Sequence, residues 1–315
     1  MTENTEEDAI NGPRGKLRIL ILGPTGQLGR ELQRSFSSLG RVTAADRNYV
    51  DLARPDQIRA LIQRIQPGLI LNAAAYTAVD RAESERELAF AINAEAPHVL
   101  AEEAAKLDAL LVHYSTDYVF DGAKPEPWTE ADPPRPLGVY GASKLAGERA
   151  IQNVAGKHLI FRTSWVYGPS GQNFLLTMLR LARERSRLSI VDDQVGAPTT
   201  SIALAHATHS IVAGILAGRF GAAEDWAGIY HMTCAGSTPW FGFAQAIFAR
   251  ATALPGVNAP ELVPISTAEY PTAAQRPRNS VLSNAKLHAR FGIQLPTWES
   301  ALDAFFETLR TQYPQ

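Results

Sequence analysis

Residues 17–29 read LRILILGPTGQLG, and this stretch decides the class of fold. Its apolar run is short and ends at a glycine, which is typical of a strand buried on both faces of a parallel sheet. Gly23, Gly26 and Gly29 then follow at a GxxGxxG spacing and lead into a helix predicted over residues 27–36. Glycines let the backbone approach a pyrophosphate closely, and the N-terminus of the helix favours negative charge. The stretch therefore predicts a dinucleotide-binding loop.

Strand and helix patterns alternate over the rest of the first half of the chain. Short apolar runs predict strands over residues 41–45, 69–74, 110–115 and 158–163. Helical patterns lie between them, over residues 55–65, 82–107 and 140–153, with a break expected at Pro97. This alternation predicts an α/β fold of the Rossmann type, in which a doubly wound parallel sheet carries helices on both faces.

The sequence pattern divides the chain into three parts. Residues 1–16 are polar and acidic, which predicts a disordered tail. Residues 17–170 hold the alternating pattern and are predicted to form the dinucleotide-binding domain. In residues 171–315 prolines and turn signals are frequent, so we expect mainly a smaller C-terminal substrate-binding lobe with returns to the main sheet.

Charge and composition narrow the class of partner. The 315 residues include 30 basic and 32 acidic side chains, and the formal net charge is −2. No basic excess points to nucleic acid or to an anionic membrane surface, and no apolar run reaches the roughly 18 residues of a membrane span. The single cysteine, Cys234, allows no intramolecular disulfide, and the first 16 residues lack the apolar core of a secretion signal. We therefore expect a cytoplasmic enzyme with a small-molecule substrate.

Residues 140–144 read YGASK and are the strongest catalytic motif. Tyr140 and Lys144 are four residues apart and share one face of a helix. A tyrosine has an ordinary pKa of about 10, and a nearby ammonium lowers the pKa toward useful acid–base behaviour. Lys144 can also bind the ribose of a nicotinamide. Thr116 follows a buried strand, at the sheet edge where ligands bind, and can hold a substrate carbonyl.

The end of the second predicted strand bears on the choice of coenzyme. Asp46 can bind the hydroxyls of the adenosine ribose, whereas Arg47 beside it can meet a 2′-phosphate. Asp51 and Leu52 are expected to flank the adenine. The two signals conflict, so NADPH and NADH both stay open as cofactors.

Several longer motifs together resemble a known family. They are NAAA at 72–75, STDYVFDG at 115–122, RTSWVYG at 162–168, DQVGAPT at 193–199 and RPRNS at 276–280. With the glycine loop and YGASK they resemble the extended short-chain dehydrogenase/reductases that act on nucleotide sugars, within them the dTDP-4-dehydrorhamnose reductases. The resemblance runs from Leu17 nearly to the C-terminus. It implies reduction of a 4-keto group in dTDP-4-dehydro-L-rhamnose, the last step of dTDP-L-rhamnose synthesis for cell-surface polysaccharide.

The resemblance also assigns roles to matching positions. It places Thr116, Tyr140 and Lys144 in catalysis. It implies coenzyme contacts by a second set of residues, which are Gln27, Leu28, Gly29, Ala75, Tyr76, Thr77, Tyr114, Tyr140 and Lys144. It implies substrate contacts by Val79, Thr116, Asp117 and Trp165. The cationic candidates for binding a diphosphate are Arg162, Arg180, Arg276 and Arg278.

The resemblance leaves the metal question and the assembly open. Some family members are magnesium-linked dimers that use glutamates. Glu31 matches one such position, but Ile202 stands at the second. No metal ligand set is therefore assigned beyond Glu31, and a homodimer stays an open alternative.

Other activities on this scaffold remain as alternatives. Related 4,6-dehydratases carry Thr-Asp-Glu where this chain has Thr116-Asp117-Tyr118, so the base that would remove a sugar proton is missing and dehydration is not expected. A nucleotide-sugar 4-epimerase and a reductase of another keto sugar remain. A non-catalytic regulatory subunit, of the type of the methionine adenosyltransferase beta subunit, is the alternative from a different class.

Overall fold

The computed structural model describes residues 16–154, 156–252 and 257–312. The tail predicted over residues 1–16 therefore lies, apart from Lys16, outside the described residues. Helices and strands alternate from β1 (Arg18–Leu22) onward, as the sequence predicts. Within the described ranges, no helix is long and apolar enough to cross a membrane.

A six-stranded parallel sheet forms the centre of the molecule. Its order is β10-β5-β4-β3-β1-β2. The strands besides β1 are β2 (Arg41–Ala45), β3 (Leu69–Asn72), β4 (Leu110–Thr116), β5 (His158–Thr163) and β10 (Gly228–His231). All five neighbouring pairs are parallel, so the predicted Rossmann-type sheet is confirmed. The edge strand β10 comes from the second half of the chain.

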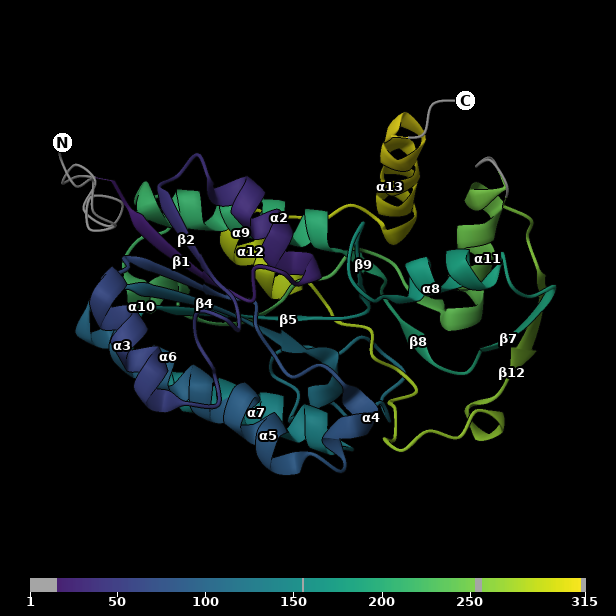
Figure 1. Ribbon diagram of the computed structural model, residues 1–315, viewed down its shortest axis with the longest axis horizontal. Coiled ribbons are helices and arrows are strands. Elements are labelled where there is room, and N and C mark those ends of the chain that lie inside the picture. The colour runs from purple at the N-terminus through teal and green to yellow at the C-terminus, as the bar shows by residue number, and fades with distance from the viewer. Residues whose placement is uncertain (1–15, 155, 253–256, 313–315) are drawn as a thin grey trace, which may run out of the picture.

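Helices cover both faces of this sheet (Figure 1). One face carries α2 (Gln27–Phe36), α9 (Ser201–Leu216) and α12 (Ala285–Phe291), and the other carries α3 (Pro55–Ile65), α6 (Ala96–Lys106) and α7 (Val139–Asn153). Successive residues of β1 point to opposite faces: Ile19 and Ile21 pack toward α2, whereas Leu20 and Leu22 pack toward α3. The unbroken apolar run in the sequence follows from this burial on both sides.

The helical stretch before β4 differs in detail from the prediction. It consists of α5 (Arg86–Phe90), the π-helical turn η1 (Ala91–Glu95) and α6, which follow one another directly. Pro97 lies in the first turn of α6 and is not a break between separate helices. Pro97 has no N–H, so it cannot donate to the Asn93 carbonyl four residues earlier, and that carbonyl packs closely against Gly147 of α7.

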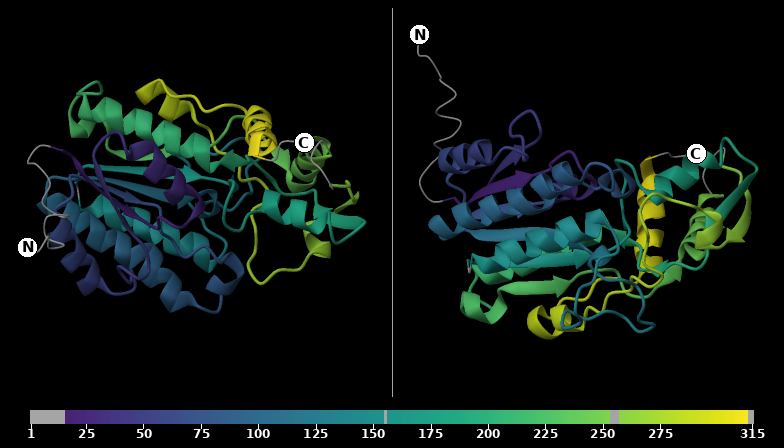
Figure 2. Two further views of the ribbon diagram at one scale, coloured as in Figure 1. Left: turned by 45° about the horizontal axis from the view of Figure 1, so that its top comes forward. Right: turned by 90° about the horizontal axis from the view of Figure 1, so that it is seen from below.

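A second group of elements packs at one end of the sheet (Figure 2). It includes α8 (Phe174–Leu181), α11 (Trp240–Ala251), α13 (Trp298–Gln312) and the parallel pair β7 (Arg187–Val191) with β12 (Glu261–Ile265). Aromatic side chains such as Tyr167, Phe243 and Phe305 fill its core. Two short pairs, β6 (Val166–Tyr167) with β9 (Thr199–Thr200) and β8 (Val195–Gly196) with β11 (Thr238–Pro239), connect it to the sheet.

The remaining elements are short. They are α4 (Val79–Ala82), η2 (Asp117–Val119), α10 (Ala223–Trp226) and η3 (Thr267–Glu269). Of these, α4 follows the loop at the carboxyl end of β3, and η2 follows β4 directly. They therefore lie where a parallel sheet binds its ligands.

Candidate active site

The glycine loop has the close packing that its sequence predicts. Gly23 has a φ of +73°, and a Cβ added there would lie 2.8 Å from the Cα of Ala74. A Cβ on Gly29 would overlap the carbonyl of Gly23. Only glycine fits these two positions, so the backbone turns tightly into the N-terminus of α2 and leaves that end open to an anion.

The other predicted coenzyme residues surround this loop, but several side chains are engaged elsewhere. The Gln27 amide donates to the carbonyl of Val166 at 3.3 Å and accepts from Asn173 at 2.9 Å. The Tyr114 hydroxyl donates to Thr208 at 2.9 Å, on the α9 face of the sheet. These side-chain groups of Gln27 and Tyr114 are therefore engaged within the protein.

The loop after β3 is held by one buried amide. Asn93 of η1 accepts a hydrogen bond from the Tyr76 N–H at 2.8 Å and donates to the Tyr76 carbonyl at 3.0 Å. Its amide also donates to the Ser143 hydroxyl of α7 at 3.0 Å. Ala75 and Thr77 flank the clamped residue. Asn93 thus fixes the predicted coenzyme loop against α7, a contact that the sequence analysis missed.

Asp46 and Asp51 lie beyond the end of β2, as expected for adenosine contacts. The Asp46 carboxylate accepts from the Asn48 N–H at 2.9 Å, and the Asp51 carboxylate accepts from the Ala53 N–H at 2.9 Å. Leu52 packs against the core beneath α3. Both carboxylates therefore stabilise local turns.

Tyr140, Thr116 and Asp117 come together across β4 and α7. Tyr140 is in the first turn of α7, whose Val139 N–H donates to Glu83 at 2.8 Å. Burial raises the pKa of Tyr140 to about 12, and the neighbouring Thr116 hydroxyl opposes that rise. The Thr116 hydroxyl also bonds to the Asp117 carboxylate at 3.0 Å. Burial raises the pKa of Asp117 to about 7.

Lys144 lies one turn along α7 and points into the sheet edge. Its amine donates to the Tyr114 carbonyl at 2.6 Å and lies 3.1 Å from Nε2 of His113. Burial lowers the pKa of Lys144 to about 8, while the Glu148 carboxylate raises it. The described hydrogen bonds of Lys144 thus go to β4 and not to the Tyr140 hydroxyl.

A cleft opens beside Tyr140. Its lining combines the predicted Val79 with Tyr118, which meets the Tyr140 ring edge-on at a centroid distance of 5.8 Å. Ala274 and Pro277, from the RPRNS region, form the opposite wall. Tyr118 and this wall were not assigned from the sequence. Tyr118 and Pro277 lie within the STDYVFDG and RPRNS motifs, and this was their signal in the sequence.

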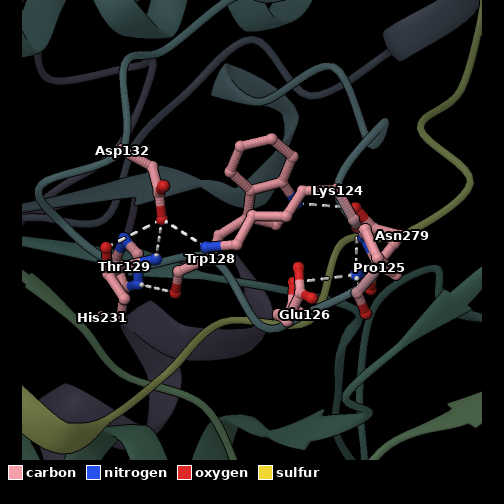
Figure 3. A network of polar contacts seen from close by, with 8 residues as sticks. All are labelled: Lys124, Pro125, Glu126, Trp128, Thr129, Asp132, His231 and Asn279. Carbon is pink, nitrogen blue, oxygen red and sulfur yellow. Dashed lines mark hydrogen bonds and ion pairs between the residues drawn. The ribbon is translucent and has the colours of Figure 1, made fainter.

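Asn279 holds that wall against the segment after η2 (Figure 3). Its amide donates to the carbonyls of Lys124, Pro125 and Glu126, at 2.8, 3.1 and 3.1 Å. The Trp128 indole donates back to the Asn279 carbonyl at 2.9 Å. These bonds explain why an asparagine follows the two arginines of the RPRNS motif.

Trp165 is set in a strained backbone conformation at the border of the second group of elements. Its φ is +46°, which is unusual for a bulky residue. Its ring stacks on Trp240, with ring centroids 3.4 Å apart and planes 4° apart. Trp165 lies outside the residues that line the Tyr140 cleft. The structure therefore does not bring it into that cleft with Val79.

The cationic candidates differ in what they contact. Arg162 is buried and pairs with Glu148 at 2.6 Å, so it is a structural residue beneath the site. Arg180 pairs with Glu184 at 2.9 Å on an exposed face. Arg276 pairs with Asp80 at 2.7 Å beside the cleft. Of these three, Arg276 is the one adjacent in sequence to Pro277 of the cleft wall.

Glu31, the one residue considered for magnesium, is buried and pairs with Arg34 at 2.8 Å. Among the described residues no group of three or more His, Cys, Asp or Glu side chains is arranged to hold a metal ion. The structure therefore assigns Glu31 a salt bridge and no ligand set.

Comparison with known proteins decides the family. A model described as the RmlD substrate binding domain matches residues 17–311. The dTDP-4-dehydrorhamnose reductase of Burkholderia thailandensis is 48% identical over 299 residues, which cover 94% of this chain and 100% of the relative. The chain belongs to the dTDP-4-dehydrorhamnose reductase family. The Escherichia coli reductase of this family is 44% identical over 303 residues, covering 94% of this chain and 99% of its own.

Solved structures of the dTDP-4-dehydrorhamnose reductase family agree with this assignment. The Bacillus anthracis protein, in complex with NADP, superposes with a TM-score of 0.85 at 37% identity. The match covers 93% of this chain and 100% of the Bacillus anthracis chain. UDP-glucose 4-epimerase of Thermus thermophilus reaches a TM-score of 0.72 at 21% identity, covering 93% and 99%. The latter likeness concerns the fold alone. The resemblance inferred from the sequence motifs is thereby confirmed.

Proposed function

We propose that this protein is an NAD(P)H-dependent oxidoreductase that reduces the 4-keto group of dTDP-4-dehydro-L-rhamnose to give dTDP-L-rhamnose. The observation that carries the proposal is 48% identity over 299 residues with a reductase of that name. The geometry supports it, because the hydroxyls of Thr116 and Tyr140 meet beside one cleft.

The coenzyme is proposed to lie across the carboxyl ends of the strands, with its pyrophosphate on the glycine loop. The fit rests on Gly23 and Gly29, where any side chain would fill the space that the backbone needs. The remaining proposed contacts are Gly26, Gln27, Leu28, Asp46, Asp51, Leu52, Ala75, Tyr76, Thr77, Tyr114, Tyr140 and Lys144. A related protein binds NADP, which favours NADPH over NADH.

When bound, the reduced nicotinamide supplies the hydride. Tyr140 donates its proton to the carbonyl oxygen of the substrate, and Thr116 hydrogen-bonds the same oxygen. Burial raises the pKa of Tyr140 to about 12, which keeps the phenol protonated and ready to act as an acid. Lys144 is proposed to bind the coenzyme ribose and to lower the pKa of Tyr140 during turnover.

The substrate is proposed to contact Val79, Thr116, Asp117 and Trp165. Residues 17–170 would hold the coenzyme, and residues 171–315 would mainly hold the sugar nucleotide. A cytoplasmic location is proposed, and it agrees with the single cysteine and with a nucleotide-sugar substrate. We propose no magnesium requirement, because Glu31 is already paired with Arg34.

The proposal is tested by following NADPH and NADH oxidation with dTDP-4-dehydro-L-rhamnose made in situ. We expect one coenzyme oxidised for each dTDP-L-rhamnose formed. An epimerase would instead keep its coenzyme bound and consume none. If verified substrate and folded protein gave no oxidation, the reductase assignment would be wrong. A stoichiometric partner enzyme in a pull-down would then support a regulatory subunit.

A further inference from the structure

Three buried side chains form a chain beneath the site, and the proposed reaction uses only one of them. Asn72 and His113 face each other in the register between β3 and β4, and Lys144 comes from α7. Their exposed fractions are 1%, 0% and 1%. The Asn72 amide nitrogen lies 3.0 Å from Nδ1 of His113, and Nε2 of His113 lies 3.1 Å from the Lys144 amine.

The orientation of Asn72 sets the position of the proton on His113. The Asn72 oxygen accepts from the Ala74 N–H at 3.3 Å, so the amide N–H₂ turns toward His113. Nδ1 of His113 must therefore accept. Burial holds the pKa of His113 well below its usual range, so the ring is neutral and carries one proton. That proton sits on Nε2, which faces Lys144.

A donor aimed at the Lys144 amine requires a lone pair on that nitrogen. An ammonium has three donors and no lone pair, so it cannot accept from an Nε2–H group. The uncharged amine can accept this bond and still donate to the Tyr114 carbonyl at 2.6 Å. The hydrogen-bond pattern is thus complete when Lys144 is neutral.

We propose that His113, oriented by Asn72, is a positioning residue that holds Lys144 at the edge of β4 as an uncharged amine until the coenzyme binds. The inference rests on the proposed function in one respect, because that function needs a charged Lys144 during turnover. Lys144 must then take one proton from solvent as the complex forms. The amine gains an N–H bond, and the Nε2–H···N hydrogen bond is lost.

The other charged and titratable groups around Lys144 do not oppose this state strongly. Glu148, on the same helix, favours the ammonium. Its carboxylate, however, is already bound by Arg162 of β5 at 2.6 and 2.9 Å and by the Ser115 hydroxyl at 2.5 Å. Tyr140, one turn earlier, is a neutral phenol near neutral pH. Burial lowers the pKa of Lys144 to about 8, and the His113 donor favours the neutral amine further.

The first test needs no activity. The protein is labelled with ¹⁵N-histidine, and two-bond proton–nitrogen NMR spectra distinguish the two tautomers of each ring. The signals of His113 are identified as those that disappear in the His113→Gln variant. We expect His113 of the coenzyme-free protein to carry its proton on Nε2. A proton on Nδ1 would mean that Nε2 accepts from a charged Lys144, and the proposal would be overturned whatever reaction the protein catalyses.

The second test measures proton uptake when NADPH binds. Calorimetry near pH 8, in two buffers of different ionisation enthalpy, should show uptake approaching one proton per site. His113→Asn keeps a polar group near the Nδ1 position but removes the Nε2 donor that faces Lys144. The proton uptake on NADPH binding should therefore fall by half or more. His113→Gln keeps a donor near the Nε2 position and should retain most of the uptake. Uptake in His113→Asn equal to that of wild type would contradict the proposal.

A matched control separates this effect from the loss of any buried histidine. His231 is also fully buried, and it bonds to the Trp128 carbonyl at 3.1 Å, away from Lys144. His231→Asn should leave the proton uptake unchanged. Melting temperatures of the three variants show whether each is folded. If His113→Asn does not fold, the tautomer measurement on the wild-type protein still decides the proposal.

Discussion

At the scale of single residues, the hydroxyl of Tyr140 carries the proposed proton transfer. Tyr140→Phe keeps the ring against Tyr118 and removes only the acid, so turnover should fall roughly 100-fold or more while NADPH affinity stays within a few-fold. Steady-state kinetics and coenzyme titration measure the two effects. Tyr167→Phe is the matched control, because the buried Tyr167 hydroxyl has no hydrogen-bond partner among the described residues. Full activity in Tyr140→Phe would remove Tyr140 from the mechanism.

Asp117 makes stability depend on pH. Burial raises its folded-state pKa from 3.8 to about 7, so the folded protein binds more protons than the unfolded chain across that interval. Its contribution to stability is therefore lost as the pH rises toward 7 and is constant above it. Asp117→Asn stays neutral and avoids the loss. From about pH 5 to about pH 8, the variant should gain roughly 2–3 kcal/mol in unfolding free energy relative to wild type, at about 1.4 kcal/mol per pKa unit.

Denaturant unfolding of both proteins across this range measures the gain. A constant difference at all pH values would show that Asp117 titrates as it does in the unfolded chain.

The same residue shows what the sequence could predict. The STDYVFDG motif placed Asp117 at the carboxyl end of a strand, but its full burial arises from packing by distant segments.

At the scale of elements, local pattern predicted most of the sheet and its helices. The helix over residues 55–65 agrees with α3, whose buried apolar residues recur at the helical period. The strand over residues 41–45 agrees with β2, of which Ala45 is the buried residue. The π-helical turn η1 was not predicted, because it depends on contact with α7 as well as on Pro97. Asn93 was missed for the same reason, since its partners Tyr76 and Ser143 are distant in sequence.

The contact between η1 and α7 predicts the effect of a small substitution. A Cβ on Gly147 would overlap the carbonyl oxygen of Asn93, which is backbone and cannot swing away. Gly147→Ala should therefore lower the unfolding free energy by about 1–3 kcal/mol, although alanine favours helices. Gly156→Ala is the control, because its Cβ would make an ordinary contact of 3.4 Å with Ala105. A more stable Gly147→Ala protein would mean that α7 moves freely against η1.

At the scale of the whole molecule, Asp80 joins two segments that are 196 residues apart in the chain. Its carboxylate bonds to Arg276 at 2.7 and 3.2 Å and to the Ala274 N–H at 3.0 Å, so the α4 side of the cleft is tied to the opposite wall. The sequence placed Arg276 in the RPRNS motif but gave no sign of its pairing with Asp80. The guanidinium also holds the pKa of Asp80 below its usual value. The cleft thus depends on a contact that only the folded chain creates.

Breaking this tie should act on substrate binding more than on chemistry. Asp80→Asn weakens the bidentate pair and loosens the wall formed by Ala274 and Pro277, whereas Tyr140 and the glycine loop keep their contacts. We expect KM for the sugar nucleotide to rise about 5- to 10-fold, because a partly exposed ion pair with two hydrogen bonds contributes about that much. The value of kcat should change by less than about twofold, and the affinity for NADPH should stay unchanged. Glu261→Gln is the matched control, since its pair with Arg187 at 3.9 Å is exposed and lies outside the cleft. A fall in kcat at constant KM would instead place Asp80 in the chemical step. Equal KM values in Asp80→Asn and Glu261→Gln would show that the pair of Asp80 with Arg276 does not shape the substrate site.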